Sequence, residues 1–401
     1  MRIRPQTHAR WIMLLALVLA SASQGQPGTI ERILRAPDGA AHEQFGASLD
    51  VLGTTVAVGA PFAAGPESAT GACYVFDAQT GELLLKLQPD APEPFAMFGH
   101  AVALTPTSVL VGAPDASVAD TDRVGKVYVF DRTTGEQTGV IEPEITQESL
   151  HFGHRIASNG SRVVITAAGT FSSGRTPLVQ GRAWLFDAAG LAPLGEIPPP
   201  GGIANGFGVE VTMNDSFIAI GMGNIRGGGY VVLHDTDGGF VWRYNEPNDV
   251  PDGTAWGANA ALSGDDVIVP VRNLAPDAGT GAAQVRVYRA GGPAEMARFS
   301  QPAPALFSAF GSAVSATEHA LIVGSYAEDI ECYECGAAFI YSLPERTLLA
   351  RVDGIPSDRG GPRLGTAIDA EGGIAAVAAM ADDQNGAFAG AVYIIRLPSS
   401  P

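Results

Sequence analysis

Residues 98–114 read FGHAVALTPTSVLVGAP, and the aromatic-glycine pair that opens this stretch returns throughout the chain. Successive glycines of the pair are 53, 54, 55, 49, 54 and 54 residues apart. A unit of that length accommodates one four-stranded antiparallel sheet, so the period predicts a β-propeller rather than a helical solenoid. The pair stands at Phe45-Gly46, Phe98-Gly99, Phe152-Gly153, Phe207-Gly208, Trp256-Gly257, Phe310-Gly311 and, in altered form, Leu364-Gly365.

The repeat unit from residue 99 to 152 contains four segments that resemble strands, at residues 100–104, 109–112, 126–131 and 138–142. Turn-forming residues separate the segments, as antiparallel strands require. The third segment of several repeats carries aromatic residues before a turn, as in Tyr128-Val129-Phe130-Asp131. We expect these rings to fill the space between neighbouring sheets, and the repeated glycine to permit a close approach to the adjacent blade.

The two ends of the repeat array complement each other. The seventh repeat has a third strand at residues 391–397 but no fourth, whereas residues 31–38 resemble the segment 82–90 that precedes the second pair. Pairing of this N-terminal strand with the last repeat would close a ring and remove exposed sheet edges. We therefore expect one all-β domain over residues 29–398, a seven-bladed β-propeller with repeats starting near residues 46, 99, 153, 208, 257, 311 and 365.

Residues 1–22 have the features of an export signal. Arg2, Arg4 and Arg10 accompany an apolar segment over residues 11–20, and Ala20-Ser21-Ala22 provides small residues for cleavage. The apolar run is short for a bilayer span. We expect a signal peptide that is removed, which would leave the mature chain secreted, periplasmic or at the cell surface.

The chain is acidic, with a formal net charge of −18 at pH 7, and removal of the three signal arginines would make it more so. An acidic surface repels phosphate backbones and anionic lipid headgroups. We therefore expect neither nucleic acid binding nor membrane insertion. With 46% hydrophobic residues the chain can bury a large core, and we expect a monomer.

Two motifs together resemble FG-GAP repeats, which build the seven-bladed propeller of integrin α chains and occur in many exported bacterial proteins. The second motif, Gly-Ala-Pro, is intact at residues 59–61 and 112–114. The resemblance covers nearly the whole mature chain and implies a propeller that serves as a binding platform. In the other repeats the motif is replaced by Ala167-Ala168-Gly169, Gly221-Met222-Gly223, Pro270-Val271-Arg272, Gly324-Ser325-Tyr326 and Ala378-Ala379-Met380.

Calcium-binding members of that family carry an Asp-rich loop between the first and second strands. The corresponding links here, such as residues 105–108 and 158–161, are short and poor in acids. We therefore expect no calcium in these links and no cofactor. Asp115, Asp120 and Asp122 are weak candidate metal ligands, because they lie in a long loop where solvated acids are ordinary.

The remaining chemical groups give little support for catalysis. The chain lacks a Gly-x-Ser-x-Gly elbow, a His-Glu-x-x-His motif and a phosphate-binding loop with lysine, and no catalytic residue is predicted. Cys332 and Cys335 predict a small disulfide in an exported chain. Four histidines beside the aromatic-glycine pairs indicate a polar region near one face, namely His42, His100, His151 and His154.

Connections between strands two and three, and from strand four to the next repeat, are long and variable, so we expect them to share one face and to carry recognition. Candidate ligand-binding residues in these loops are Phe62, Phe171, Arg175, Arg226, Tyr326, Tyr333 and Phe388. The sequence favours a non-catalytic binding or adhesion module for a protein or glycan. A glycan-active hydrolase or lyase, which paired carboxylates in the central channel would favour, and a structural envelope component are the alternatives.

Overall fold

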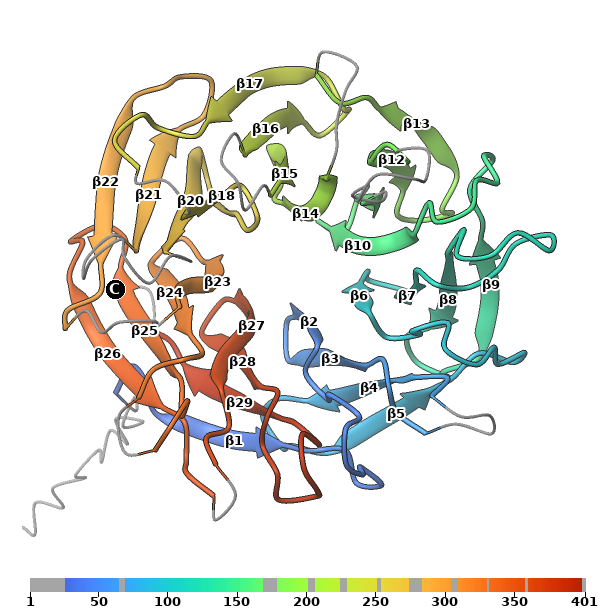
Figure 1. The fold of residues 1–401 in the computed structure, drawn as a ribbon, viewed down its shortest axis with the longest axis horizontal. Coiled ribbons are helices and arrows are strands. Elements are labelled where there is room, and N and C mark those ends of the chain that lie inside the picture. The colour runs from blue at the N-terminus through green and yellow to red at the C-terminus, as the bar shows by residue number, and fades with distance from the viewer. Residues whose placement is uncertain are drawn as a thin grey trace, which may run out of the picture.

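Seven small antiparallel sheets surround a central channel like the blades of a propeller (Figure 1). This arrangement confirms the all-β, seven-bladed fold expected from the repeat. The computed structural model describes residues 26–64, 69–168, 179–200, 206–223, 229–250, 254–273, 283–303, 309–329, 332–357 and 360–398. The expected signal peptide over residues 1–22 and the candidates Phe171, Arg175 and Arg226 lie outside the described residues.

Six blades each consist of strands that follow one another in sequence, from the channel to the rim (Figure 1). The strands are β2 (Ser48–Leu52), β3 (Thr55–Ala60), β4 (Ala72–Asp77) and β5 (Leu83–Leu87) in the first blade; β6 (Ala101–Leu104), β7 (Ser108–Ala113), β8 (Lys126–Asp131) and β9 (Gln137–Ile141) in the second; β10 (Phe152–Ser158), β11 (Arg162–Ala167), β12 (Arg182–Asp187) and β13 (Pro193–Ile197) in the third; β14 (Phe207–Met213), β15 (Phe217–Met222), β16 (Tyr230–Asp235) and β17 (Phe240–Asn245) in the fourth; β18 (Thr254–Trp256), β19 (Ala261–Ser263), β20 (Asp266–Asn273), β21 (Gln284–Arg289) and β22 (Glu295–Ser300) in the fifth; and β23 (Phe310–Ala316), β24 (Ala320–Ser325), β25 (Ala337–Ser342) and β26 (Leu348–Asp353) in the sixth.

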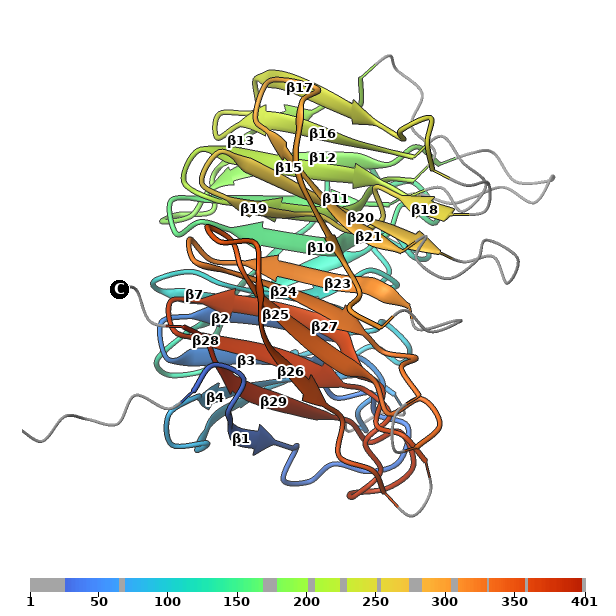
Figure 2. The same cartoon turned by 90° about the vertical axis from the view of Figure 1, so that its left-hand side faces the viewer.

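The seventh blade takes its outer strand from the other end of the chain. Its sheet has the order β27 (Leu364–Glu371), β28 (Ile374–Ala379), β29 (Ala391–Arg396) and β1 (Ile30–Leu34). β1 runs antiparallel to β29, with Leu34 opposite Val392, and Figure 2 shows the two strands side by side. The pairing confirms the predicted closure of the ring.

The aromatic-glycine pair produces an irregularity in the innermost strand. In the third blade the register between β10 and β11 shifts between Phe152 and Arg155, and the fourth, sixth and seventh blades show the same shift. In the fifth blade the irregularity divides the strand, so that β18 and β19 both pair with β20. The seven glycines have φ angles from 75° to 99°, which a residue with a side chain rarely adopts.

The aromatic side chains of the pairs form the core between strands and neighbouring blades. Phe98 is fully buried, and its ring centroid lies 5.4 Å from that of Tyr128 and 5.8 Å from that of Phe130 on β8. Equivalent edge-to-face contacts join Phe310 to Phe339. These edge-to-face contacts are favourable for aromatic rings, and they hold each inner strand against the third strand of its own blade.

The glycines of the two motifs meet between consecutive blades. A Cβ on Gly59 would lie 2.0 Å from the carbonyl oxygen of Gly99, and a Cβ on Gly112 would lie 2.2 Å from that of Gly153. Neither site has room for a side chain unless the backbone moves. This contact gives a physical reason for the recurrence of both motifs at a fixed spacing.

In the third blade, Thr166 occupies the position that Gly59 and Gly112 hold in the first two. The prediction that Ala167-Ala168-Gly169 replaces the Gly-Ala-Pro motif is therefore wrong by one residue. Thr166 lies opposite Arg155, as Gly59 lies opposite Ser48 in the first blade. Its buried hydroxyl donates a hydrogen bond of 2.7 Å to the carbonyl oxygen of Gly208. A hydrogen bond to the next blade here replaces the close approach of two glycines.

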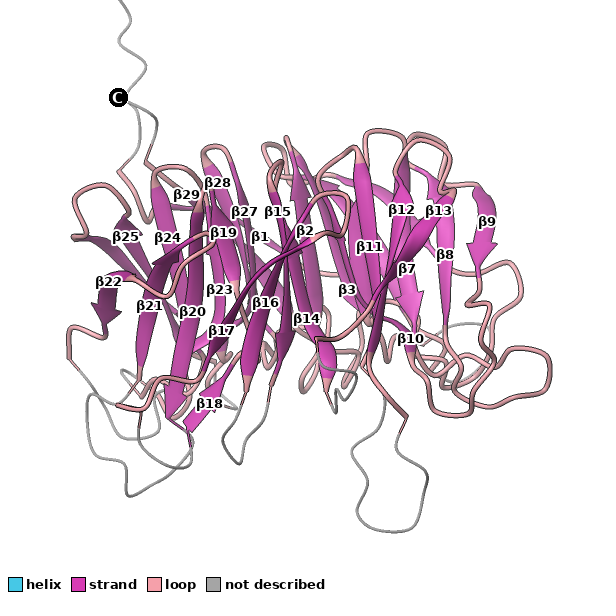
Figure 3. Ribbon diagram, turned by 90° about the horizontal axis from the view of Figure 1, so that it is seen from above, coloured by secondary structure: helices cyan, strands magenta, loops and turns pink. Residues whose placement is uncertain are grey.

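The two faces of the disc differ in the length of their connections (Figure 3). We call the face with the links between strands one and two and between strands three and four the turn face. The opposite face, which we call the loop face, has the links between strands two and three and the connections between blades. β1 begins and β29 ends at the turn face, so residues 26 and 398 lie on that side.

Candidate functional site

Four exposed aromatic side chains lie on the loop face of consecutive blades. Tyr333 belongs to the sixth blade and Phe388 to the seventh, whereas Phe62 follows β3 of the first blade and Phe95 lies in the connection to the second. The exposed fractions are 74%, 42%, 38% and 67%, respectively. We call these four residues the aromatic arc, and three of them were candidates from the sequence.

Phe388 is held by residues of two blade connections. Its carbonyl oxygen accepts the N–H of Gln44 at 3.2 Å, and its ring stacks on His42 with the ring centroids 5.9 Å apart. The Arg363 guanidinium lies 5.7 Å from the Phe388 ring centroid and donates a hydrogen bond of 2.6 Å to Glu334. These contacts connect Phe388 to the loop that carries Tyr333.

Phe95 was missed by the sequence analysis. Its φ angle of 62° lies in the left-handed region, which bulky residues seldom adopt, and its N–H donates to the carbonyl oxygen of Ala69 at 3.2 Å. Phe95 stands four residues before the repeated glycine of its pair, and this fixed position could have indicated it from the sequence. His42 and Ser149 occupy that position in other repeats, with φ angles of 69° and 61°.

The disulfide candidates and Tyr326 lie in or beside the loop of the sixth blade. Cys332 and Cys335 are joined by a disulfide that closes the loop carrying Tyr333, whereas Cys73 is a buried free thiol. Tyr326 is half-buried and forms a hydrogen bond with the Arg272 side chain of the fifth blade. Tyr326 therefore connects two blades and contributes less exposed surface than the aromatic arc.

The three weak metal candidates do not form a metal cage. Asp115 pairs with His151, with 3.3 Å between Oδ1 and Nε2, whereas Asp120 and Asp122 are exposed. Among the described residues, no group of three or more His, Cys, Asp or Glu side chains could hold a metal ion.

Two of the four histidines near the repeated pairs contact each other. The ring centroids of His100 and His154 are 4.9 Å apart, and His100 Nδ1 lies 3.1 Å from the carbonyl oxygen of His154. Burial and the nearby Arg155 charge lower the pKa of His100 to about 4 and that of His154 well below its usual value. Both imidazoles are therefore neutral at pH 7.

The central channel contains two polar cavities that no sequence motif indicated. A cavity of about 730 Å³, here called the channel mouth, is lined by the links between strands one and two and opens at the turn face. A cavity of about 320 Å³, here called the inner channel, lies deeper. The two share Asn214 and Asp369 in their linings, so they are adjacent along the channel.

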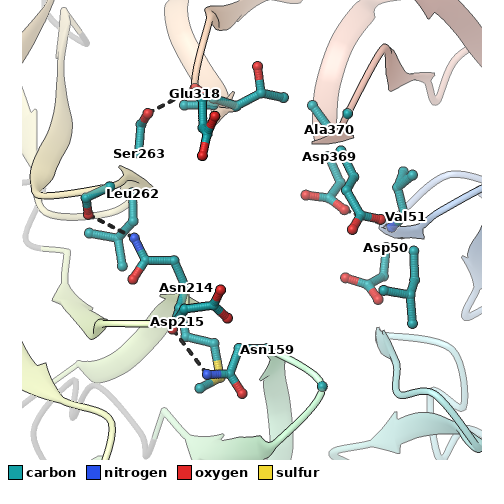
Figure 4. A pocket seen from close by; sticks show the side chains of 18 of the residues that line it. Asp50, Val51, Asn159, Asn214, Asp215, Leu262, Ser263, Glu318, Asp369 and Ala370 are labelled. Atoms are coloured by element: carbon teal, nitrogen blue, oxygen red, sulfur yellow. Dashed lines mark hydrogen bonds between the residues drawn. The ribbon is translucent and has the colours of Figure 1, made fainter.

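Side chains around the channel mouth bond from blade to blade (Figure 4). Asn159 Nδ2 donates to the carbonyl oxygen of Asn214 at 3.1 Å, and Asn214 Nδ2 donates to that of Gly264 at 2.9 Å. Ser263 Oγ donates to the carbonyl oxygen of Thr317 at 2.8 Å. The three carbonyl groups that accept these bonds lie just after the innermost strands, in the links between strands one and two, so the bonds satisfy backbone groups that lack a strand partner.

Asp50 and Asp369 also bond to the next blade, and they do so through their carboxylate groups. Asp50 Oδ2 accepts the N–H of Leu104 at 2.6 Å, and Asp369 Oδ2 accepts the N–H of Val51 at 2.7 Å. Burial, together with the charge of Asp369, raises the pKa of Asp50 well above its usual value, and burial raises the pKa of Asp369 to about 6. Each acid is the fourth residue after its repeated glycine. The other blades have Ala103, Ala157, Thr212, Ala261 and Ser315 at this position.

The inner channel adds a partly exposed ion pair. Arg155 Nε lies 3.6 Å from Glu210 Oε2, and both residues line the cavity. Burial raises the pKa of Glu210 to about 7 despite the attraction of Arg155. Carboxyl groups with raised pKa values in a cavity are candidates for proton transfer, although structural contacts raise pKa values as well.

A family model of the FG-GAP repeat matches residues 29–76, which extend from β1 through most of β4. The later blades repeat the glycine of the aromatic-glycine pair, with an aromatic residue before it in all but the seventh, and a sheet of four strands in all but the fifth. The protein is an FG-GAP repeat β-propeller. No curated protein matches the chain. The part of this FG-GAP propeller that the structure describes contains no helix of the length and apolar character needed to cross a bilayer.

Proposed function

We propose that this FG-GAP propeller is an exported, non-catalytic binding or adhesion module that holds a protein or glycan against the aromatic arc. The supporting observation is the exposure of Tyr333, Phe388, Phe62 and Phe95, from 38% to 74%, on the loop face of consecutive blades. Aromatic side chains are frequent anchors of binding surfaces because they bury a large area with few rotatable bonds.

The rigid attachment of the arc favours recognition. Phe95 and Phe388 have φ angles of 62° and 56°, and backbone hydrogen bonds to Ala69 and Gln44 hold them. A surface that is ordered before binding loses less conformational entropy when a partner docks. Unusual backbone conformations that the surrounding structure maintains are also found more often at functional sites.

The proposal is tested with the mature chain, from residue 23 onward, on a glycan array and in a pull-down from cell surfaces. Phe95→Ala and Phe388→Ala should weaken capture of the partner by about tenfold or more without lowering the melting temperature. Phe240→Ala is the matched control, because Phe240 is 60% exposed but begins β17 beside a turn of the opposite face. Unchanged capture by both arc variants would refute the use of this surface.

Export is tested separately by expressing the full chain and sequencing the N-terminus of the secreted product. We expect cleavage after about residue 22, because Ala20-Ser21-Ala22 follows the apolar segment. A product that remains in the cytoplasm with Met1 intact would contradict export and would leave the binding experiment unaffected.

A glycan-active enzyme is the second candidate, because Asp50, Asp369 and Glu210 place carboxyl groups in the channel cavities. The bonds from the first two to backbone N–H groups of the next blade favour a structural role instead. Incubation of a glycan library with wild type and Glu210→Gln distinguishes the roles. Product formation that the variant lacks would establish the enzyme.

A further inference from the structure

We infer that the channel mouth binds a linear aliphatic polyamine, a ligand that carries several ammonium groups along a flexible chain. The mouth is a cavity of about 730 Å³, which is within the size range of small-molecule sites. It opens at the turn face, away from the aromatic arc, so the inference does not depend on the proposed function.

The charge of the lining selects a cation. Of the described residues that line the mouth, none is Lys or Arg, and His319 is the single histidine. Figure 4 shows Asp50 and Asp369 reaching into the cavity from one side and Asp215 and Glu318 from other sides. Glu371 adds a fifth carboxylate to the lining. A concave site lined by one sign of charge concentrates the electrostatic potential and attracts the opposite charge.

The acceptors that remain available in the mouth are carboxylate oxygens. The amide oxygens of Asn159 and Asn214 already accept backbone N–H groups of their own turns, and the hydroxyl of Ser263 donates to the next blade. Asp215 and Glu318 are exposed. Among the described residues, no donor forms a hydrogen bond with either carboxylate. Ammonium groups donate strong, charge-assisted hydrogen bonds to such oxygens.

The spacing of the acids disfavours a single metal ion. A calcium ion needs six to eight oxygen ligands at about 2.3–2.6 Å. No group of three or more acidic, histidine or cysteine side chains within the described residues could hold a metal ion. Carboxylates on different walls of one cavity instead suit a ligand whose charges are separated along a chain.

The lining also offers apolar surface for the hydrocarbon segments of such a chain. Four apolar residues line both the mouth and the inner channel, so they lie between Asp215 and Glu318 at the opening and the deeper Arg155–Glu210 pair. These residues are Met213, Leu262, Ala316 and Ala370. Methylene groups between two ammonium groups can cover this surface, as the stems of lysine side chains do at protein surfaces.

Titration calorimetry of the mature protein with spermidine at low ionic strength tests the inference. We expect saturable binding to one site and a higher melting temperature in the presence of spermidine. The double variant Asp215→Asn/Glu318→Gln should weaken binding by about tenfold, because two charge contacts at the partly exposed rim are lost. Both residues are exposed, so the variant should fold as wild type.

Glu136→Gln is the matched control for charge. Glu136 is an exposed acid in the turn before β9 on the same face, outside the channel lining. The variant should bind spermidine as wild type does. Three outcomes would overturn the inference. Absence of saturable heat would indicate that there is no site, and equal weakening by Glu136→Gln would indicate general charge attraction. Equal heat from Mg²⁺ at the same concentration would indicate a metal site.

Discussion

Single residues maintain the spacing between blades, and the contact between Gly112 and Gly153 shows how little room there is. A methyl group on Gly112 would meet the carbonyl oxygen of Gly153 at 2.2 Å. Gly112→Ala should therefore lower the free energy of unfolding by about 1–3 kcal/mol, as overpacking does. Gly139→Ala is the control, because a Cβ there meets no atom within 4 Å. Denaturant titration measures both, and equal stabilities of the two variants would contradict this account.

The carboxyl group of Asp369 should make the stability of the fold depend on pH. Asp369→Asn keeps an oxygen that can accept the N–H of Val51 but removes a charge beside Glu371. In the folded protein the pKa of Asp369 is raised from 3.8 to about 6, so its ionised form opposes folding above about pH 6. Protonation relieves this penalty as the pH falls from about 7 to about 4.

The Asp369→Asn variant should therefore melt at a higher temperature than wild type at pH 8, and the difference should shrink through that window. The buried histidines act in the opposite direction, but they are common to both proteins and cancel in the difference. Thermal melts from pH 4 to pH 8 provide the measurement. A difference that stays constant across the range would show that the Asp369 carboxyl does not titrate as stated.

At the level of elements, β1 closes the ring by pairing with β29. Leu34 of β1 is 3% exposed and packs with Phe45 and Val392 in the core between the seventh and first blades. Leu34→Ala should lower the free energy of unfolding by about 2–5 kcal/mol, and deletion of residues 29–35 should lower it further and promote aggregation through the exposed edge of β29. Light scattering and thermal melts measure these effects.

Glu31→Gln is the control for the closing strand. It weakens the ion pair between Glu31 and Arg396, which is partly exposed, and should change stability by less than about 1 kcal/mol. An unchanged melting temperature after deletion of residues 29–35 would show that β1 is dispensable for closure.

The number of blades and their closure could be predicted because each depends on a repeated local pattern. An aromatic-glycine pair and an incomplete last repeat leave a signal in the sequence alone. The channel acids leave no such signal, because Asp50 and Asp369 stand at a position that other repeats fill with Ala, Ser or Thr. Their proximity follows only when the first and seventh blades become neighbours. Phe95 could not be predicted for a similar reason, because its exposure depends on a left-handed backbone conformation within a connection between blades.

At the scale of the whole molecule, the closed ring predicts that the fold does not depend on where the N- and C-termini lie along it. The N–H of Gly28 donates to the carbonyl oxygen of Arg396 at 2.9 Å, so the two ends meet in one sheet. A circular permutant that joins residue 398 to residue 26 through a short glycine-rich linker, with new ends between Thr133 and Thr134, should fold. Thr133 and Thr134 are exposed in the turn between β8 and β9.

The permutant should melt within a few degrees of the parent and keep its circular dichroism spectrum. A permutant that is unfolded would show that the order of synthesis, and not only the closed arrangement of blades, is needed to reach this structure. Opening the chain instead within β7, whose residues are largely buried, is the control that should fail.

Because residues 26 and 398 both emerge at the turn face, the disc can be anchored without obstructing its opposite side. A biotin acceptor sequence appended after residue 398 would immobilise every molecule on a sensor chip in one orientation, with Phe95 and Phe388 directed toward the flowing analyte. Random amine coupling would instead present a mixture of orientations, and the ratio of the two signals would report which side of the disc captures its partner.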